Sequence, residues 1–143
     1  MTLIIGVSLL EQIHSHGERT YPEEAAGFLL GRIENETRLV EAILPAGNVR
    51  EDAARRNRYL LNPQAVLAAE DHAEAIGLEI LGIFHSHPDH PDRPSEIDRE
   101  WALPWYTYLI TSVINATAVG TRCWRLREDR SAFAEEECRV RSD

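Results

Sequence analysis

Apolar residues in this sequence fall into short runs, and the polarity pattern within each run predicts a strand or a helix. Continuous or alternating runs are typical of strands, which we expect at residues 2–7, 25–32, 37–44, 78–84, 106–115, 121–127 and 132–140. The run at 78–84 is apolar throughout, as in a strand covered on both faces. The polar turn between 25–32 and 37–44 predicts a hairpin.

Helix signals separate these strands. Ser8 and Glu11 have the spacing of a capping box, so a helix is expected to start there and to end near Gly17. Asn62-Pro63 predicts the start of a second helix, whose apolar residues recur at helical spacing up to Gly77. A short third helix is expected at 95–102, and the polar segment 45–58 is expected to be a loop. This order of elements predicts an α/β (α+β) fold in which helices flank a mixed, curved sheet.

Composition excludes several classes of protein. The chain has 143 residues and a formal net charge of −9, and all its 15 basic residues are arginine. We therefore expect one domain, 1–143, with no affinity for the phosphates of nucleic acids. No apolar run approaches the roughly 18 residues that cross a bilayer, and the first residues lack the features of a leader peptide. Cys123 and Cys138 are expected to be free thiols of a cytoplasmic protein.

The tripeptide His-Ser-His occurs twice, at His14–His16 and at His85–His87. Residues two apart on a helix point about 200° away from each other, so the first pair cannot bind one ion together. Residues two apart on a strand lie on the same face, so His85 and His87, at the end of the buried strand, can converge on one metal. Imidazole suits zinc, and a catalytic zinc site has three protein ligands with the fourth position left to water.

The segment after His87 offers several candidate third ligands: Asp89, His90, Asp92, Ser95, Glu96 and Asp98. One interpretation is the HxHxDH pattern of metallo-β-lactamase-like hydrolases, which needs further histidines downstream. All six histidines lie at or before His90, so this interpretation is disfavoured. In another, Ser95 and Asp98 only form a capping box that starts the short helix. A third adds both residues to the metal site.

The full pattern of Glu24 in Glu-x-x-Gly-Phe-Leu-Leu-Gly, followed by His85-Ser-His87-Pro and then Ser95-x-x-Asp98, resembles the JAMM (MPN+) zinc metallopeptidases. The resemblance covers most of the chain and implies the JAMM/MPN, cytidine-deaminase-like fold. It implies one Zn²⁺ per chain held by His85, His87 and Asp98, with Glu24 as general base and then acid and Ser95 as hydrogen-bond donor to the reacting carbonyl. Glu24 is selected over Glu23 because the family's glutamate stands three residues before the glycine.

Small bacterial members that act on sulfur-carrier proteins look most similar in size. The resemblance implies cleavage of a peptide or isopeptide bond after the C-terminal Gly-Gly of a ubiquitin-like or sulfur-carrier β-grasp protein, received as an extended strand. Two alternatives remain open: a zinc-stabilised binding module for such tails, which needs no Glu24, and a general hydrolase of small peptides. Ser86 is expected to point away from the metal and to take no part in the chemistry.

Overall fold

The computed structural model describes residues 1–46 and 63–143. Most of the loop expected at 45–58, and the helix cap expected at Asn62, lie outside the described residues. The strands are β1 (Thr2–Gly6), β2 (Ala26–Glu34), β3 (Thr37–Pro45), β4 (Glu79–Pro88), β5 (Thr107–Ile114), β6 (Thr117–Leu126) and β7 (Phe133–Arg141). The helices are α1 (Val7–Thr20), α3 (Pro63–Ala75) and α4 (Glu96–Trp101). The elements follow the order that the polarity pattern predicts.

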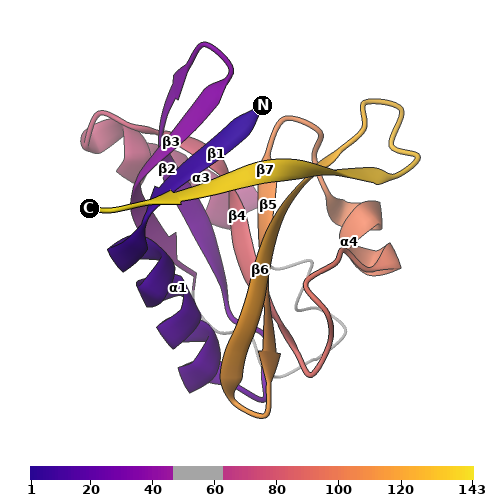
Figure 1. Ribbon diagram of the computed structural model, residues 1–143. Coiled ribbons are helices and arrows are strands. Elements are labelled where there is room, and N and C mark those ends of the chain that lie inside the picture. Colours follow the sequence, from indigo (N-terminus) through magenta and orange to yellow (C-terminus); the bar gives the residue numbers. More distant parts are fainter. Residues whose placement is uncertain (47–62) are drawn as a thin grey trace.

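The strands form one mixed sheet in the order β1-β3-β2-β4-β5-β6-β7, and the parallel pairing of β1 with β7 closes it into a barrel. The pairs β1–β3 and β4–β5 are also parallel, and the remaining pairs are antiparallel. Figure 1 shows β7 crossing beside β1, with α1 and α4 on opposite sides of the sheet. The mixed, curved sheet with helices is confirmed. Its closure was not predicted, and as a result every strand of the described sheet has two neighbours.

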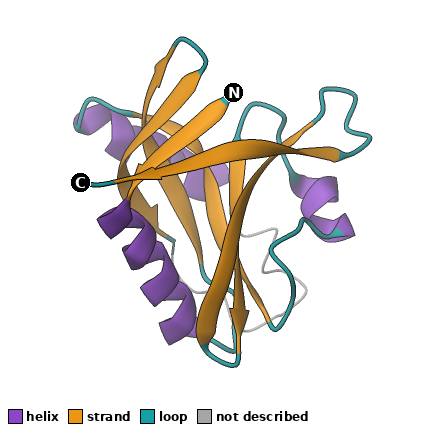
Figure 2. Cartoon of the chain, in the orientation of Figure 1, coloured by secondary structure: helices purple, strands orange, loops and turns teal. Residues whose placement is uncertain are grey.

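Two hydrophobic clusters cover the two faces of the sheet. One packs around α1 and contains Leu3, Ile5, Ile13, Leu29, Val40, Leu81, Phe84, Leu109 and Cys123. The other packs around α3 and the segment after α4, and contains Phe28, Leu30, Ala69, Ala73, Ile83, Ala102, Tyr106, Tyr108 and Leu126. The helices that provide these contacts are coloured purple in Figure 2, beside the orange strands. Alternation along β2 and β4 therefore sends neighbouring side chains to different cores.

The start of α1 differs from the sequence prediction. Its N-cap is Gly6, which makes no side-chain cap hydrogen bond, so the capping box expected from Ser8 and Glu11 is wrong. Instead, the backbone N–H of Ser8 donates to both carboxylate oxygens of Asp143, at 3.2 and 3.1 Å. The cap comes from a residue 135 positions away in sequence, so a local motif could not reveal it.

The end of α1 also differs, because the helix continues past Gly17 to Thr20. Gly17 is buried against the sheet: a Cβ there would lie 3.2 Å from Cγ2 of Val113 and 3.4 Å from Cβ of Ser86. The glycine therefore permits close approach of α1 to β4 and β5 rather than ending the helix.

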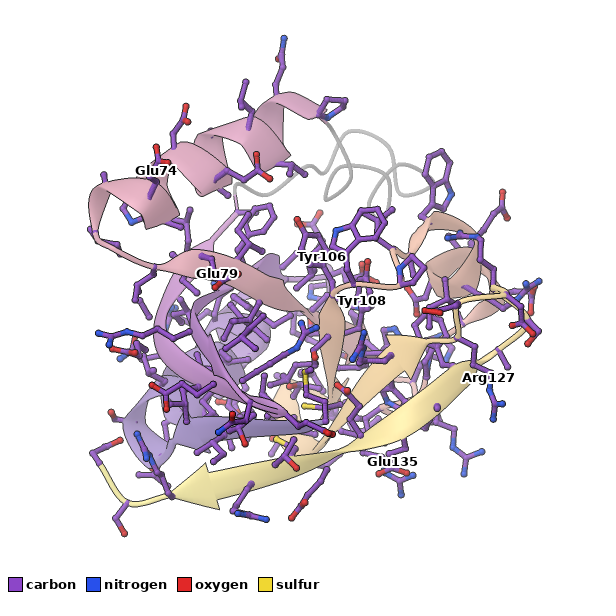
Figure 3. The ribbon with its side chains drawn as sticks, turned by 90° about the horizontal axis from the view of Figure 1, so that it is seen from above. Glu74, Glu79, Tyr106, Tyr108, Arg127 and Glu135 are labelled. Atoms are coloured by element: carbon purple, nitrogen blue, oxygen red, sulfur yellow. The ribbon has the colours of Figure 1, made fainter. Side chains whose placement is uncertain are left out.

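The strand β4 runs four residues beyond the predicted end at Phe84, so both histidines of the second His-Ser-His lie within it. Its first half includes a bulge opposite Leu29 and Leu30 of β2. Tyr106 precedes β5 and Tyr108 lies within it, and the two lie close together in Figure 3. The hydroxyl of Tyr108 accepts a hydrogen bond from the backbone N–H of Leu103 at 2.8 Å, which ties the segment after α4 to β5.

Candidate metal centre

His85 and His87 lie side by side on one face of β4, as strand alternation predicts. Their ring centroids are 5.0 Å apart, and both side chains are buried. The Nδ1–H of His87 is placed to donate to the carbonyl of Pro91 at 2.9 Å. That hydrogen bond fixes the ring and leaves Nε2 facing the interior of the site, which is the usual way in which a metal-binding histidine is oriented.

Glu24 lies in the turn before β2, next to the two histidines. The ligand atoms of Glu24, His85 and His87 all fall within 4.8 Å of one another. Oε1 of Glu24 is 3.8 Å from Nδ1 of His85. Residues 24 and 85 are distant in sequence and meet because Ala26 pairs with His85 in the antiparallel ladder of β2 and β4.

Asp98, on α4, contacts both histidines from the other side. Its Oδ1 is 3.8 Å from Nε2 of His85, and its Oδ2 is 3.1 Å from Nε2 of His87. The same Oδ2 accepts the backbone N–H of Ser95 at 2.7 Å, while Asp98 N–H donates to the Ser95 hydroxyl at 3.1 Å. The capping box is therefore present, and it also fixes the Asp98 carboxylate beside the histidines.

Burial and pairing set the protonation of these groups. Burial lowers the pKa of His85 to about 4, against the opposing effect of the Asp98 carboxylate. For Asp98, burial favours the neutral acid, but His85, the hydrogen bond from His87 and the Ser95 backbone N–H together hold its pKa below the usual range. For His87, burial lowers the pKa. Its hydrogen bond to Asp98 and the charge of Asp98 raise the pKa by more than burial lowers it, so the net shift is upward. A neutral His85 and an ionised Asp98 at neutral pH are the forms in which these side chains bind metals.

The donor set fits a divalent cation. Among the described residues, Nδ1 of His85 is a buried side-chain nitrogen with no hydrogen-bond partner. A buried polar atom without a partner is costly, and a cation on the Glu24 side of the ring would satisfy it, whereas Asp98 faces Nε2 of the same ring. Two imidazoles with carboxylates on either side are a donor set that suits zinc. Proximity alone groups Glu24 with the histidines, so the assignment of Asp98 as third ligand and Glu24 as base stays a prediction.

The remaining candidates lie as follows. Asp89, His90 and Asp92 lie in the loop between β4 and α4. The histidines of the first His-Ser-His lie on α1, and His14 hydrogen-bonds the hydroxyl of Thr121 at 2.8 Å. The only group of metal-ligand type found within the described ranges is that of Glu24, His85 and His87.

Sequence reasoning missed the contacts that hold the loop after His87. Asp89 accepts hydrogen bonds from the hydroxyl of Tyr21 at 2.5 Å and from the backbone N–H of Asn115 at 3.0 Å. The Ser112 hydroxyl donates to the carbonyl of His90 at 2.6 Å, and the Trp124 indole donates to the carbonyl of Asp92 at 3.0 Å. Two of these acceptors, on His90 and Asp92, are backbone carbonyls. Every residue has a backbone carbonyl, so the sequence gives no sign of which one accepts a hydrogen bond.

A pocket of about 500 Å³ opens beside the metal-ligand-type residues. It is lined by Pro22, Glu24, His87, Pro88, His90, Pro91, Arg93, Pro94, Ser95 and Ile97. Glu24, His87 and Ser95 thus face a volume large enough for a short peptide segment, and the prolines give its wall a fixed backbone.

The comparisons with known proteins agree with this geometry. The fold and the site define a JAB-type domain with histidines and carboxylates at a shared pocket. A JAB1/MPN domain protein from Archaeoglobus fulgidus, 20% identical, has the same fold with a TM-score of 0.61, covering 95% of this chain and 96% of that one. A protein from Desulfitobacterium hafniense, 29% identical, reaches a TM-score of 0.83 over 99% of this chain and 94% of that one.

Sequence comparison gives the family. Residues 6–127 match the model of the prokaryotic homologs of the JAB domain, and the chain belongs to this family. A probable TtuB-protein conjugate cleaving protease from Thermus thermophilus is 34% identical over 111 residues, which are 76% of this chain and 70% of the relative. A desampylase from Haloferax volcanii is 38% identical over 92 residues, 64% of this chain and 63% of the relative. None of the helices in the described part of the chain is long and apolar enough to span a membrane.

Proposed function

We propose that this chain is a zinc-dependent peptidase or isopeptidase that hydrolyses the amide bond after the C-terminal Gly-Gly of a ubiquitin-like or sulfur-carrier β-grasp protein. The observation that supports it most is the convergence of Glu24 and Asp98 on His85 and His87, beside a pocket that Glu24 and His87 line. The relatives named for conjugate cleavage and desampylation support the substrate class. The free thiols of Cys123 and Cys138 are consistent with a cytoplasmic location.

His85, His87 and Asp98 would hold one Zn²⁺. The zinc, when bound, supplies a Lewis acid that polarises the carbonyl and makes water acidic near neutral pH. Asp98 has a second task, because its carboxylate accepts the Ser95 backbone N–H in the capping box that starts α4. The loss of its charge should therefore affect the metal more than the helix.

Glu24 is the proton carrier in this proposal. Its carboxylate faces both the histidines and the pocket, where an attacking water and a substrate amide would meet. It accepts a proton from the attacking water and later donates it to the nitrogen of the departing amine, so one residue serves as base and then acid. No covalent acyl-enzyme is needed.

Ser95 stabilises the negative charge that develops on the carbonyl oxygen. Its hydroxyl oxygen accepts the Asp98 N–H, which fixes the side chain and leaves the hydroxyl proton to donate. Ser95 also lines the pocket, so this donor points to where the substrate would lie. A preorganised donor of this kind typically contributes about 2.7–4 kcal/mol to catalysis.

The Gly-Gly tail would lie in the pocket beside Glu24. Because the described sheet is closed, we expect the tail to lie in the pocket as an extended segment rather than as a full-length additional strand. Glycines have no side chains, so the backbone of the tail can approach Glu24 closely.

The Glu24→Gln variant tests the mechanism. We expect it to keep its fold and its zinc and to lose at least about a hundredfold in rate, because a general base typically contributes 10²–10⁴-fold. The measurement is mass spectrometry of β-grasp carriers extended past Gly-Gly by one or a few residues, with Glu23→Gln as the matched control.

Three results would contradict parts of the proposal. Unchanged hydrolysis by Glu24→Gln would overturn the mechanism. Tight binding of the tail without cleavage by the zinc-loaded wild type would identify a binding module. Cleavage of short peptides but not of the carriers would identify a general small-peptide hydrolase.

A further inference from the structure

We propose that Ser86, the residue between the two histidines, is a positioning residue that holds Glu24 at the metal site. The proposal rests on the proposed role of Glu24 as proton carrier. The Ser86 side chain does not enter the pocket and does not contact a reacting group. It acts through the backbone of Ala25, the residue that follows Glu24.

Two hydrogen bonds join Ser86 to Ala25. The backbone N–H of Ala25 donates to the Ser86 hydroxyl at 2.8 Å, and the backbone N–H of Ser86 donates to the carbonyl of Ala25 at 2.9 Å. The antiparallel ladder of β2 and β4 has Ala26 and His85 as its last paired residues at this end. The hydroxyl of Ser86 thus extends the pairing by one residue, up to the peptide bond that follows Glu24.

Strand alternation places the Ser86 side chain on the face of β4 opposite to the histidines. His85 and His87 point to the face shared with Glu24, while Ser86 points to the α1 face. There Ser86 is 3% exposed and Ala25 is also 3% exposed, and the close approach of α1 at Gly17 covers Ser86. The hydrogen bond to the Ala25 N–H is therefore shielded from water, which would otherwise compete for it.

The surroundings of Glu24 show why this bond matters. Glu24 lies two residues before the first residue of β2, and Ala25 stands between them. On the N-terminal side, the hydrogen bond of Tyr21 to Asp89 lies at the exposed surface. On the C-terminal side, the pair of Ala25 and Ser86 is buried and lies on the same strand as both histidines. Ser86 thereby sets the position of the Glu24 carboxylate relative to His85 and His87.

The Ser86→Ala variant tests this inference, with Thr111→Val as the matched control. Thr111 lies next to Ser86 on β5, is 1% exposed, and hydrogen-bonds the hydroxyl of Thr121 at 3.0 Å. Both variants remove one buried hydroxyl from neighbouring strands, but only Ser86→Ala removes the acceptor of the Ala25 N–H. Ser86→Cys, which keeps the volume and is a poorer acceptor, serves if the alanine variant does not fold.

The first readout needs no catalysis. We expect amide hydrogen exchange at Ala25, measured by NMR, to be at least about tenfold faster in Ser86→Ala and unchanged in Thr111→Val. Zinc content should remain that of the wild type in both variants. Unchanged exchange at Ala25 would overturn the proposal, and so would loss of zinc, which would show that Ser86 acts on the histidines instead.

The second readout is kinetic. We expect kcat to fall at least about tenfold in Ser86→Ala with little change in KM, because a misplaced catalytic group costs rate more than binding. In a Glu24→Gln background, Ser86→Ala should have less than a twofold effect, because no base remains to be positioned. Equal losses in both backgrounds would contradict the inference. Wild-type protein that cleaves no carrier would refute the proposed function, while exchange at Ala25 would still decide the role of Ser86.

Discussion

Asp98 meets two requirements in the candidate site, one structural and one electrostatic. Asp98 completes a capping box and also places a charge beside two histidines. Its carboxylate stays ionised because its pKa is held below the usual range: burial opposes this, and the histidines and the Ser95 N–H outweigh it. The capping box that the sequence left open is therefore present, and the addition of Ser95 and Asp98 to the metal site stays a prediction.

We expect Asp98→Asn to separate the two roles. The amide oxygen can still accept the Ser95 N–H, so α4 should keep its start, but the charge that a cation requires is lost. Zinc affinity should fall by at least about a hundredfold, more than the 10–100-fold that a residue next to a ligand typically contributes. Titration with zinc measures it.

Glu96→Gln is the matched control for this change. It removes the same charge two residues earlier on α4, where Glu96 is exposed and pairs with Arg99. Equal zinc affinity in Asp98→Asn and the wild type would show that Asp98 is not a ligand.

At the scale of elements, the sequence predicted where strands and helices lie better than how they begin and end. Strand alternation was sufficient to bring His85 and His87 together, because it requires no knowledge of other elements. Glu24 and Asp98 were assigned only through resemblance to a family, since their contacts with the histidines depend on how β2 and α4 pack against β4. The cap of α1 shows the same limit: the acceptor that binds Ser8 comes from the other end of the chain.

The Asp143→Ala variant tests that cap. Loss of both acceptors at the start of α1 should lower the free energy of unfolding by about 1 kcal/mol, the typical value of a helix cap. Urea denaturation measures it. Ser8→Ala should change stability little, because the Ser8 side chain makes no cap hydrogen bond. A larger effect of Ser8→Ala than of Asp143→Ala would restore the capping box predicted from sequence.

At the scale of the whole molecule, the candidate metal site lies on a framework whose two hydrophobic clusters contain none of Glu24, His85, His87 and Asp98, so we expect this framework to fold without the metal. The two clusters on the faces of the sheet bury β4 on both sides before any ligand is considered. This differs from small zinc domains, which are unfolded without metal. The continuous apolar run of β4 predicted this burial, whereas the closure of the sheet could not be predicted, because pairing between the first and last strands has no local signal.

Removal of zinc should therefore leave the fold intact and reduce its stability. We expect a chelator to lower the melting temperature without changing the far-ultraviolet circular dichroism. The stabilisation that zinc provides should grow with its concentration and reach about 2.7 kcal/mol at a hundred times its Kd. Calorimetry at several zinc concentrations measures it. Loss of secondary structure on chelation would show instead that the metal is part of the framework.

The pairing of β1 with β7 also has a consequence for biosynthesis. Thr2 pairs with Glu137, and Gly6 pairs with Arg141, so the barrel needs residues from both ends of this sequence. Until the ribosome has made β7, β1 can pair only with β3, and its other edge stays unpaired. Contacts between such distant residues form slowly. A nascent chain halted before β7 would thus expose an unpaired strand edge, the kind of surface on which chaperones act and aggregates start.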